Sequence, residues 1–163
     1  MTECSLVYDL LLSGYDTWRF PLVGVITGAA LALMYVVFRA IRVPISRGFK
    51  ITFVLQMILA LAWTIAGLIW TYDEYAELAR RYRRGDFIEV SGKVENFDQG
   101  LSPARPGDER FTVNGVTFFY SQNMVSAGFR KTHNSGGPLR DGMTVKIRYI
   151  GSSIVRLEIC EAS

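Results

Sequence analysis

The sequence predicts an α+β membrane protein, in which a two-helix transmembrane hairpin continues through a helical stalk into a small five-stranded antiparallel β-barrel of the OB type. Residues 20–38 and 51–72 predict the hairpin, because both runs are uncharged and mostly apolar. At about 1.5 Å per helical residue, each run spans about 30 Å of hydrocarbon. After residue 86 apolar and polar residues alternate, which is typical of strands.

The two apolar runs lack the polar face that a helix of a soluble protein presents to water. A pair of helices buried in a soluble core is the alternative, but the rest of a 163-residue chain is too small to cover both. A helix satisfies its backbone hydrogen bonds within one segment, as hydrocarbon requires. The runs are therefore predicted to lie in a lipid bilayer.

Small residues recur along both runs and predict where helices approach one another. They are Gly24, Gly28 and Ala32 in the first run and Ala62 and Ala66 in the second. Small residues at intervals of four let membrane helices pack closely. The stripe either closes the hairpin on itself or joins two protomers into a homo-oligomer, and the sequence does not separate these alternatives.

Gln56 is the strongly polar side chain within the apolar runs. One interpretation makes it a pore or relay residue. The favoured interpretation is a hydrogen bond between helices, because the amide has no charged companion in the runs.

The link at residues 39–50 sets the predicted orientation. It carries four basic residues and no acidic one, and short basic links favour the cytoplasm. Both termini and the β-domain are then expected in the periplasm. The arginines within residues 80–84 favour the opposite orientation, but acidic residues at 73–77 stand between them and the bilayer.

The N-terminal tail, residues 1–19, is acidic and has no signal-peptide pattern. Apolar residues within 6–12 fall at helical spacing, so the tail either lies along the membrane interface or forms an ordered tail without that role. Cys4 and Cys160 lie near opposite ends of the chain without a paired motif or metal spacing, and they do not define a redox compartment.

Residues 73–85 keep helical periodicity and are expected to form the stalk, which Gly85 would end. Residues 86–163 form the β-domain. Alternation predicts a strand at 88–94, a hairpin through Asn114-Gly115, and two final strands around 143–149 and 155–159. An open meander is the alternative to the barrel.

Two long loops interrupt these strands. Residues 98–109 are rich in Gly and Pro and are expected to be mobile. Residues 121–142 form a connection longer than a compact domain usually has, and such loops are often binding elements. The candidate binding residues are Phe129, Lys131, His133, Asn134 and Arg140.

The sequence offers little catalytic chemistry. His133 is the single histidine, so a histidine-based metal site is excluded, and no Gly-rich phosphate loop opens a helix. We therefore expect no metal, no cofactor and no enzyme. Basic strand residues are offset by acidic ones, so nucleic acid is not an expected partner.

A set of single residues and short motifs is spread over residues 75–159. The set comprises Tyr75, Tyr82, Gly85, residues 90–94, Phe97, residues 111–121, Gly128, Phe129, residues 136–138, Gly142, residues 145–149 and residues 156–159. In these residues the C-terminal half resembles a widespread group of small, functionally uncharacterised bacterial membrane proteins. The resemblance implies a bacterial envelope protein without a catalytic residue.

The predicted function is a membrane-anchored, non-catalytic binding module of the bacterial inner membrane. Its expected partners are the lipid bilayer and an unknown protein or small-molecule ligand. The alternative is a two-helix effector whose β-domain senses a soluble ligand and whose helices assemble to perturb the membrane.

Overall fold

The computed structural model describes residues 3–42, 44, 46–100 and 107–161. The chain divides into two compact units. Residues 16–73 form one unit, here called the hairpin unit, and residues 1–15 together with 74–163 form the other, here called the sheet unit. The segment expected to be mobile, residues 98–109, lies partly outside the described residues.

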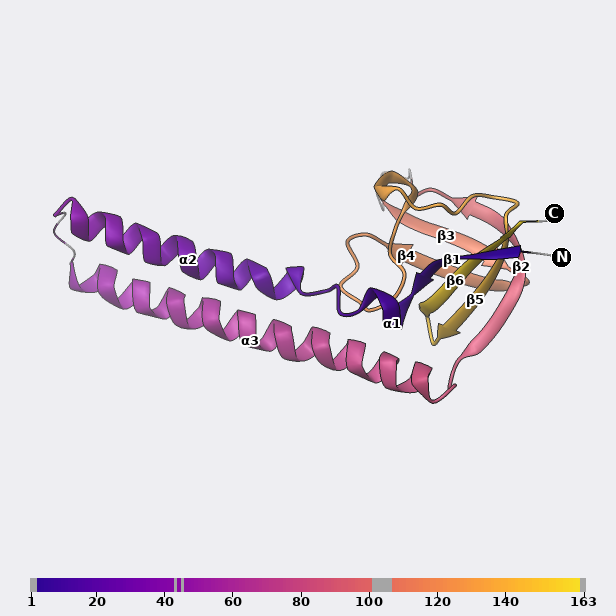
Figure 1. Cartoon of the computed structure of the whole chain (residues 1–163). Coiled ribbons are helices and arrows are strands. Elements are labelled where there is room, and N and C mark those ends of the chain that lie inside the picture. Colours follow the sequence, from indigo (N-terminus) through magenta and orange to yellow (C-terminus); the bar gives the residue numbers. More distant parts are fainter. Residues whose placement is uncertain (1–2, 43, 45, 101–106, 162–163) are drawn as a thin grey trace. The chain divides into compact units, whose positions relative to one another are not determined.

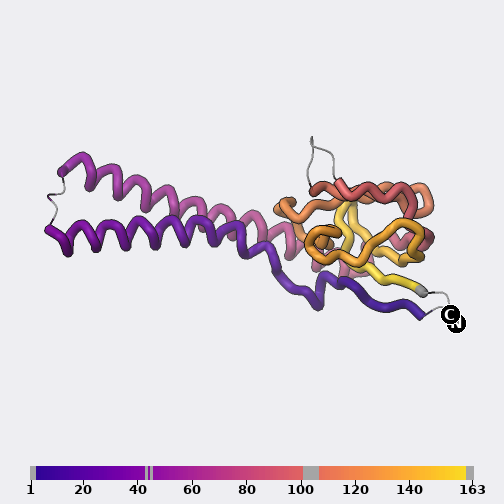
Figure 2. The backbone as a smooth tube through the Cα atoms, turned by 90° about the horizontal axis from the view of Figure 1, so that it is seen from above, coloured from indigo at the N-terminus to yellow at the C-terminus, as the bar shows by residue number. Residues whose placement is uncertain are grey.

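The hairpin unit contains helix α2 (Arg19–Ala40) and most of helix α3 (Arg47–Arg83), which run side by side in opposite directions (Figures 1 and 2). Both are long and apolar enough to cross a membrane, with mean hydropathies of 2.1 and 2.0 in their most apolar windows. Only 11% of each window is buried within the chain. Because their surfaces are so largely uncovered, these helices are unlike the core helices of a soluble domain.

The ends of α3 follow local sequence chemistry. The backbone N–H of Phe49 donates to Ser46 Oγ at 3.2 Å, so Ser46 acts as an N-terminal cap. At the other end Gly85 adopts φ +79°, and Asp86 N–H donates to the carbonyl of Arg81 at 3.0 Å. A left-handed glycine of this kind satisfies the last helical carbonyls. The predicted stalk is thus the continuation of α3 rather than a separate helix.

Gly24 lies on the face of α2 that contacts α3. A Cβ atom at Gly24 would lie 2.8 Å from the carbonyl oxygen of Ala60 and would also clash with Thr64 Oγ1. At Gly28 a Cβ would lie 4.0 Å from Ala60 Cβ. These two members of the small-residue stripe therefore close the hairpin on itself.

The predicted small residues of α3 lie elsewhere. Ala62 and Ala66 are exposed, as is Ala32 on α2. The contact face of α3 carries Ala60 and Gly67 instead, and both are buried. The four-residue spacing identified a smooth stripe on α3, but the wrong face for packing within the hairpin.

The sheet unit contains one open antiparallel sheet of six strands in the order β1-β6-β5-β2-β3-β4 (Figure 1). The predicted closed barrel of five strands is wrong, because β1 and β4 remain as edges and the N-terminal tail supplies an additional strand. A short helix, α1, follows β1. The elements are β1 (Glu3–Asp9), α1 (Leu10–Ser13), β2 (Ile88–Asp98), β3 (Asp108–Val113), β4 (Val116–Ser121), β5 (Thr144–Ile150) and β6 (Ser153–Glu161).

Strand β1 joins the two ends of the chain. It pairs antiparallel with β6, and Cys4 lies opposite Cys160 in the register. The two cysteines form a disulfide across a sequence separation of 156 residues. The tail is therefore a strand followed by a single helical turn, and the interfacial helix expected as one alternative is not formed.

The turn between β3 and β4 has the predicted chemistry. Asn114 and Gly115 have φ values of +48° and +80°. Both central positions of a two-residue hairpin turn of type I′ need positive φ, which Asn and Gly tolerate best. Phe111 pairs with Phe118 across this hairpin, and their rings stack at 5.2 Å between centroids.

The core of the sheet unit takes residues from the strands, from the end of α3 and from the connection between β4 and β5. Phe111, Val113, Val145, Ile147, Val155 and Leu157 have 0% exposure. Leu78, Ala79 and Tyr82 add the end of α3 to this core.

Loss of the disulfide should weaken the sheet unit without unfolding the hairpin. Replacing Cys4, Cys160 or both with Ser should each reduce the free energy of unfolding by about 2 kcal/mol, because each change removes the same cross-link. Thermal unfolding of the full chain in detergent, with and without reductant, measures this loss. Additive losses in the double variant, or no loss in any variant, would contradict the predicted role.

Candidate functional site

The connection between β4 and β5, residues 122–143 and here called the β4–β5 loop, is the predicted binding element. Its middle forms one turn of 3₁₀ helix, η1 (His133–Ser135). Phe129 is 3% exposed, and its ring lies 5.7 Å from the Tyr8 ring and 5.3 Å from the Tyr120 ring. Phe129 is therefore a core residue that anchors the loop and is not available to a ligand.

Backbone hydrogen bonds fasten the loop at two points. Phe129 N–H donates to Ile154 O at 3.0 Å, and Gly142 N–H donates to Val94 O at 2.8 Å. Gly128 has φ +123°, and a Cβ there would lie 3.0 Å from the same Ile154 oxygen. Glycine thus permits the close approach of the loop to β6.

Glu109 is the buried charge beneath the loop. It is 1% exposed, and its carboxylate accepts hydrogen bonds from Tyr120 Oη at 2.5 Å and from the backbone N–H of His133. A buried carboxylate needs such donors because it has lost its water. Burial and the hydrogen bond to Glu109 raise the pKa of Tyr120 above its ordinary value, so the phenol remains a donor. The pair ties β3 and β4 to η1.

A tight turn follows η1. Gly136 has φ +84°, and Gly137 N–H donates to Thr132 O at 2.8 Å. A Cβ at Gly137 would lie 2.8 Å from that same oxygen, so only glycine fits. Arg140 Nη1 donates to the carbonyls of Gly137 and Leu139 at 2.8 and 2.6 Å. Arg140 therefore stabilises the turn by occupying its carbonyl oxygens.

The remaining candidates gather in one short segment. Lys131 and Asn134 are exposed, and His133 is half-buried. Within the part of the chain that is described, His133 Nδ1 is a buried atom without a hydrogen-bond partner. Residues 131–134, here called the loop tip, are thus polar side chains held on a fixed base. Of the five predicted residues, the structure brings three together here and uses Phe129 and Arg140 as supports.

Glu109 was missed as a site residue because it was grouped with the preceding loop. The position of Glu109 in the alternating pattern of β3 identifies it as a core-facing residue. Strand residues two apart share one face, so Glu109 shares the face of Phe111 and Val113, which point into the core. An acidic residue at a core-facing position must have buried partners.

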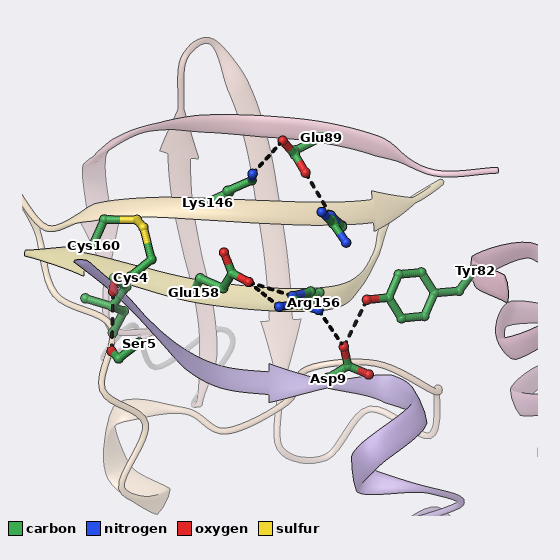
Figure 3. A network of polar contacts seen from close by, with 11 residues as sticks. Cys4, Ser5, Asp9, Tyr82, Glu89, Lys146, Arg156, Glu158 and Cys160 are labelled. Carbon is green, nitrogen blue, oxygen red and sulfur yellow. Dashed lines mark hydrogen bonds and ion pairs between the residues drawn. A yellow bond between two sulfur atoms is a disulfide. The ribbon is translucent and has the colours of Figure 1, made fainter. Parts of the chain in front are cut away.

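A second polar group lies where β1, α3 and β6 meet (Figure 3). Asp9 is 7% exposed and accepts from Tyr82 Oη at 2.9 Å and from Arg156 Nη1 at 3.4 Å. Arg156 also donates to Glu158 at 2.7 Å through Nε. These contacts join three segments that are far apart in sequence, which is a stabilising role rather than a ligand site.

Glu89 pairs across strands on the same sheet. It accepts from Arg148 Nε at 2.8 Å and lies 3.0 Å from Lys146 Nζ (Figure 3). Hydrogen bonds from Arg148 and then Lys146 lower the pKa of Glu89 below its ordinary value. Acidic and basic groups are balanced here, so the face presents no basic platform. Among the described residues no group of three or more His, Cys, Asp or Glu is placed to hold a metal ion.

No protein-family model, curated protein or solved structure matches the chain.

Replacing Glu109 with Gln should destabilise the loop base. An amide offers one acceptor oxygen where the carboxylate offers two, so either Tyr120 Oη or His133 N–H loses its acceptor. We expect a loss of about 1–3 kcal/mol in the free energy of unfolding. Thermal unfolding in detergent measures the loss, with exposed Glu95→Gln as the matched control. Equal stability of the two variants would contradict the proposed anchor.

The paired Glu89 should add a small pH dependence to stability. Because its pKa is lower in the folded state than its ordinary value of 4.5, the charged pair stabilises the fold above that pH and the contribution is lost as pH falls through the folded-state pKa. The difference in unfolding midpoint between wild type and Glu89→Gln should therefore shrink as the pH is lowered from neutral. A difference that grows on acidification would contradict this assignment.

Proposed function

We propose that the chain is a membrane-anchored, non-catalytic binding module of the bacterial envelope. In this proposal α2 and the apolar part of α3 span the inner membrane. The sheet unit lies in the periplasm and presents the loop tip, residues 131–134, to a protein or small-molecule ligand.

The low burial of both helices supports their placement in lipid. With 11% of each apolar window buried within the chain, most of their apolar surface must be covered by something else. A bilayer supplies that cover for helices of this length.

The pairing of β1 with β6 is the observation that carries the proposal. Strand β1 precedes α2, and β6 lies far beyond the apolar part of α3. Two strands can pair only on the same side of a membrane, so an even number of spans must separate them. A hairpin of two spans meets that condition, whereas a single span would separate β1 from its partner.

The disulfide supports the periplasmic side for the sheet unit. Disulfides persist in oxidising compartments such as the bacterial periplasm and are rare in the cytoplasm. Cys4 is exposed at the sheet edge, where cytoplasmic reductants would reach it. With the sheet unit in the periplasm, a hairpin of two spans would turn on the cytoplasmic side, so the proposal assigns the link, residues 39–50, to the cytoplasm, in agreement with its basic character.

The competing arginine cluster is partly neutralised. Arg80 lies 2.9 Å from Glu77, and Arg81 lies 2.7 Å from Asp86. The link has no acidic residue to offset its charge. The charge asymmetry therefore favours the link as the cytoplasmic segment.

The loop tip suits binding better than catalysis. Lys131 and Asn134 offer hydrogen-bond donors from an exposed segment, and buried residues fix its base. A pre-organised loop loses little conformational freedom on binding. The corresponding ligand would carry hydrogen-bond acceptors. No specific observation favours the effector alternative, since Gly24 and Gly28 already serve the contact within the hairpin.

Photocrosslinking in intact cells tests this function. A photoreactive amino acid at Asn134 should give discrete adducts, whereas the same residue at Lys93, an exposed position on β2, should give none above background. The second change Lys131→Ala should reduce the adducts at position 134 severalfold because it removes a charged donor. Equal adducts at the two positions, or none at either, would contradict a binding role for the loop tip.

A further inference from the structure

Gln56 lies on α3 with its side chain exposed and has no hydrogen-bond partner among the described residues. It is six residues from Lys50, which corresponds to about 9 Å along a helix. In the membrane placement proposed above, on which this inference rests, the amide lies within hydrocarbon. A polar group there needs a partner, because lipid chains offer neither donors nor acceptors.

A cavity of about 180 Å³ opens beside Gln56 on the side of the hairpin. Leu59 and Trp63 from α3 and Thr27 from α2 are among the residues that line it. The Thr27 hydroxyl donates to the Val23 carbonyl within its own helix at 2.8 Å, so its oxygen can still accept. The cavity is therefore a mostly apolar groove whose wall also carries the Gln56 amide, the Thr27 hydroxyl and the Trp63 indole N–H.

We propose that a second copy of this chain occupies the groove, with the Gln56 amides of the two copies hydrogen-bonded to each other. A carboxamide carries both a donor and an acceptor. The same side chain from a second copy therefore satisfies both functions of the first. In a two-fold dimer the same patch meets itself, and a residue near the axis faces its own equivalent.

The groove favours a second helix over a lipid chain. A lipid chain could fill the apolar part between Leu59 and Trp63 but would itself offer the amide neither a donor nor an acceptor. Hydrogen bonds between helices stabilise their association in membranes. Two symmetric bonds between the Gln56 amides, together with filling of the groove, favour one relative orientation of the two copies, which a purely apolar surface does not select.

The contact differs from the small-residue stripe. Gly24 and Ala60 also line the groove, but Gly24 packs against Ala60 and Thr64 within one hairpin, so dimerisation leaves that contact in place. The proposed interface uses the open side of the hairpin, where Gln56 points.

The test uses the full chain, labelled with donor or acceptor dye and reconstituted into phosphatidylcholine vesicles at varied protein-to-lipid ratios. Energy transfer should report a dimer in the wild type, and Gln56→Leu should weaken association about tenfold. Gln56→Asn, which keeps the amide, should retain most of the transfer. Ala62→Leu is the matched control, because Ala62 is exposed and does not line the groove.

Two readouts separate the possible failures. Resistance of the chain to alkaline extraction reports insertion, and circular dichroism reports helix content, for every variant. An inserted wild type that gives no energy transfer, or an inserted Gln56→Leu that associates as tightly as the wild type, overturns the dimer alone. A wild type that is extracted from the vesicles overturns the membrane placement and the dimer together.

Discussion

The pairing of β1 with β6 is the constraint on which the rest of the structure depends. It brings the segment before α2 into the same sheet as the last strand of the chain. The hairpin unit, residues 16–73, is therefore an insertion in the chain between β1 and the rest of the sheet unit. The Cys4–Cys160 disulfide makes this closure covalent, and Asp9 joins the end of β1 to Tyr82 and Arg156.

The same sheet determines what the β4–β5 loop can do. Burial of the Glu109 carboxylate costs desolvation energy. This burial is tolerated because the carboxylate accepts hydrogen bonds from two donors, Tyr120 Oη on the neighbouring strand and the backbone N–H of His133 in the loop. The loop base is thus tied into the core, while Lys131 and Asn134 are exposed. A loop with a buried base and an exposed polar tip can present a binding surface without folding anew on each encounter.

Patterns that depend on near neighbours in the sequence were sufficient for much of the fold. The apolar runs predicted two long helices, alternation predicted β2 to β6, and the positive φ values of Asn114 and Gly115 follow from their residue types. Strand β1 was missed because the apolar residues of 6–12 also fit a helical period. Its pairing with β6 depends on a contact across the whole chain, which local periodicity does not encode. The mistaken prediction of a closed five-stranded barrel is connected with that error, because β1 extends one edge of the sheet.

The sequence predicted the location of the candidate site but not which of its residues are exposed. Length and composition identified the β4–β5 loop, and the loop tip retains Lys131, His133 and Asn134. Phe129 and Arg140 were indistinguishable from these by residue type, because an aromatic ring or a guanidinium serves a core or a turn as well as a ligand. Only the contacts separate the supporting residues from the exposed ones.

The redox state of Cys4 and Cys160 in intact cells shows whether β1 and β6 are cross-linked and whether the sheet unit lies in an oxidising compartment. Free thiols would be blocked with a membrane-permeant alkylating reagent before lysis, and non-reducing peptide mass mapping would follow. The expected result is a peptide pair joined through Cys4 and Cys160, with neither residue alkylated. Two alkylated cysteines would contradict both the closed chain and the oxidising side proposed for the sheet unit.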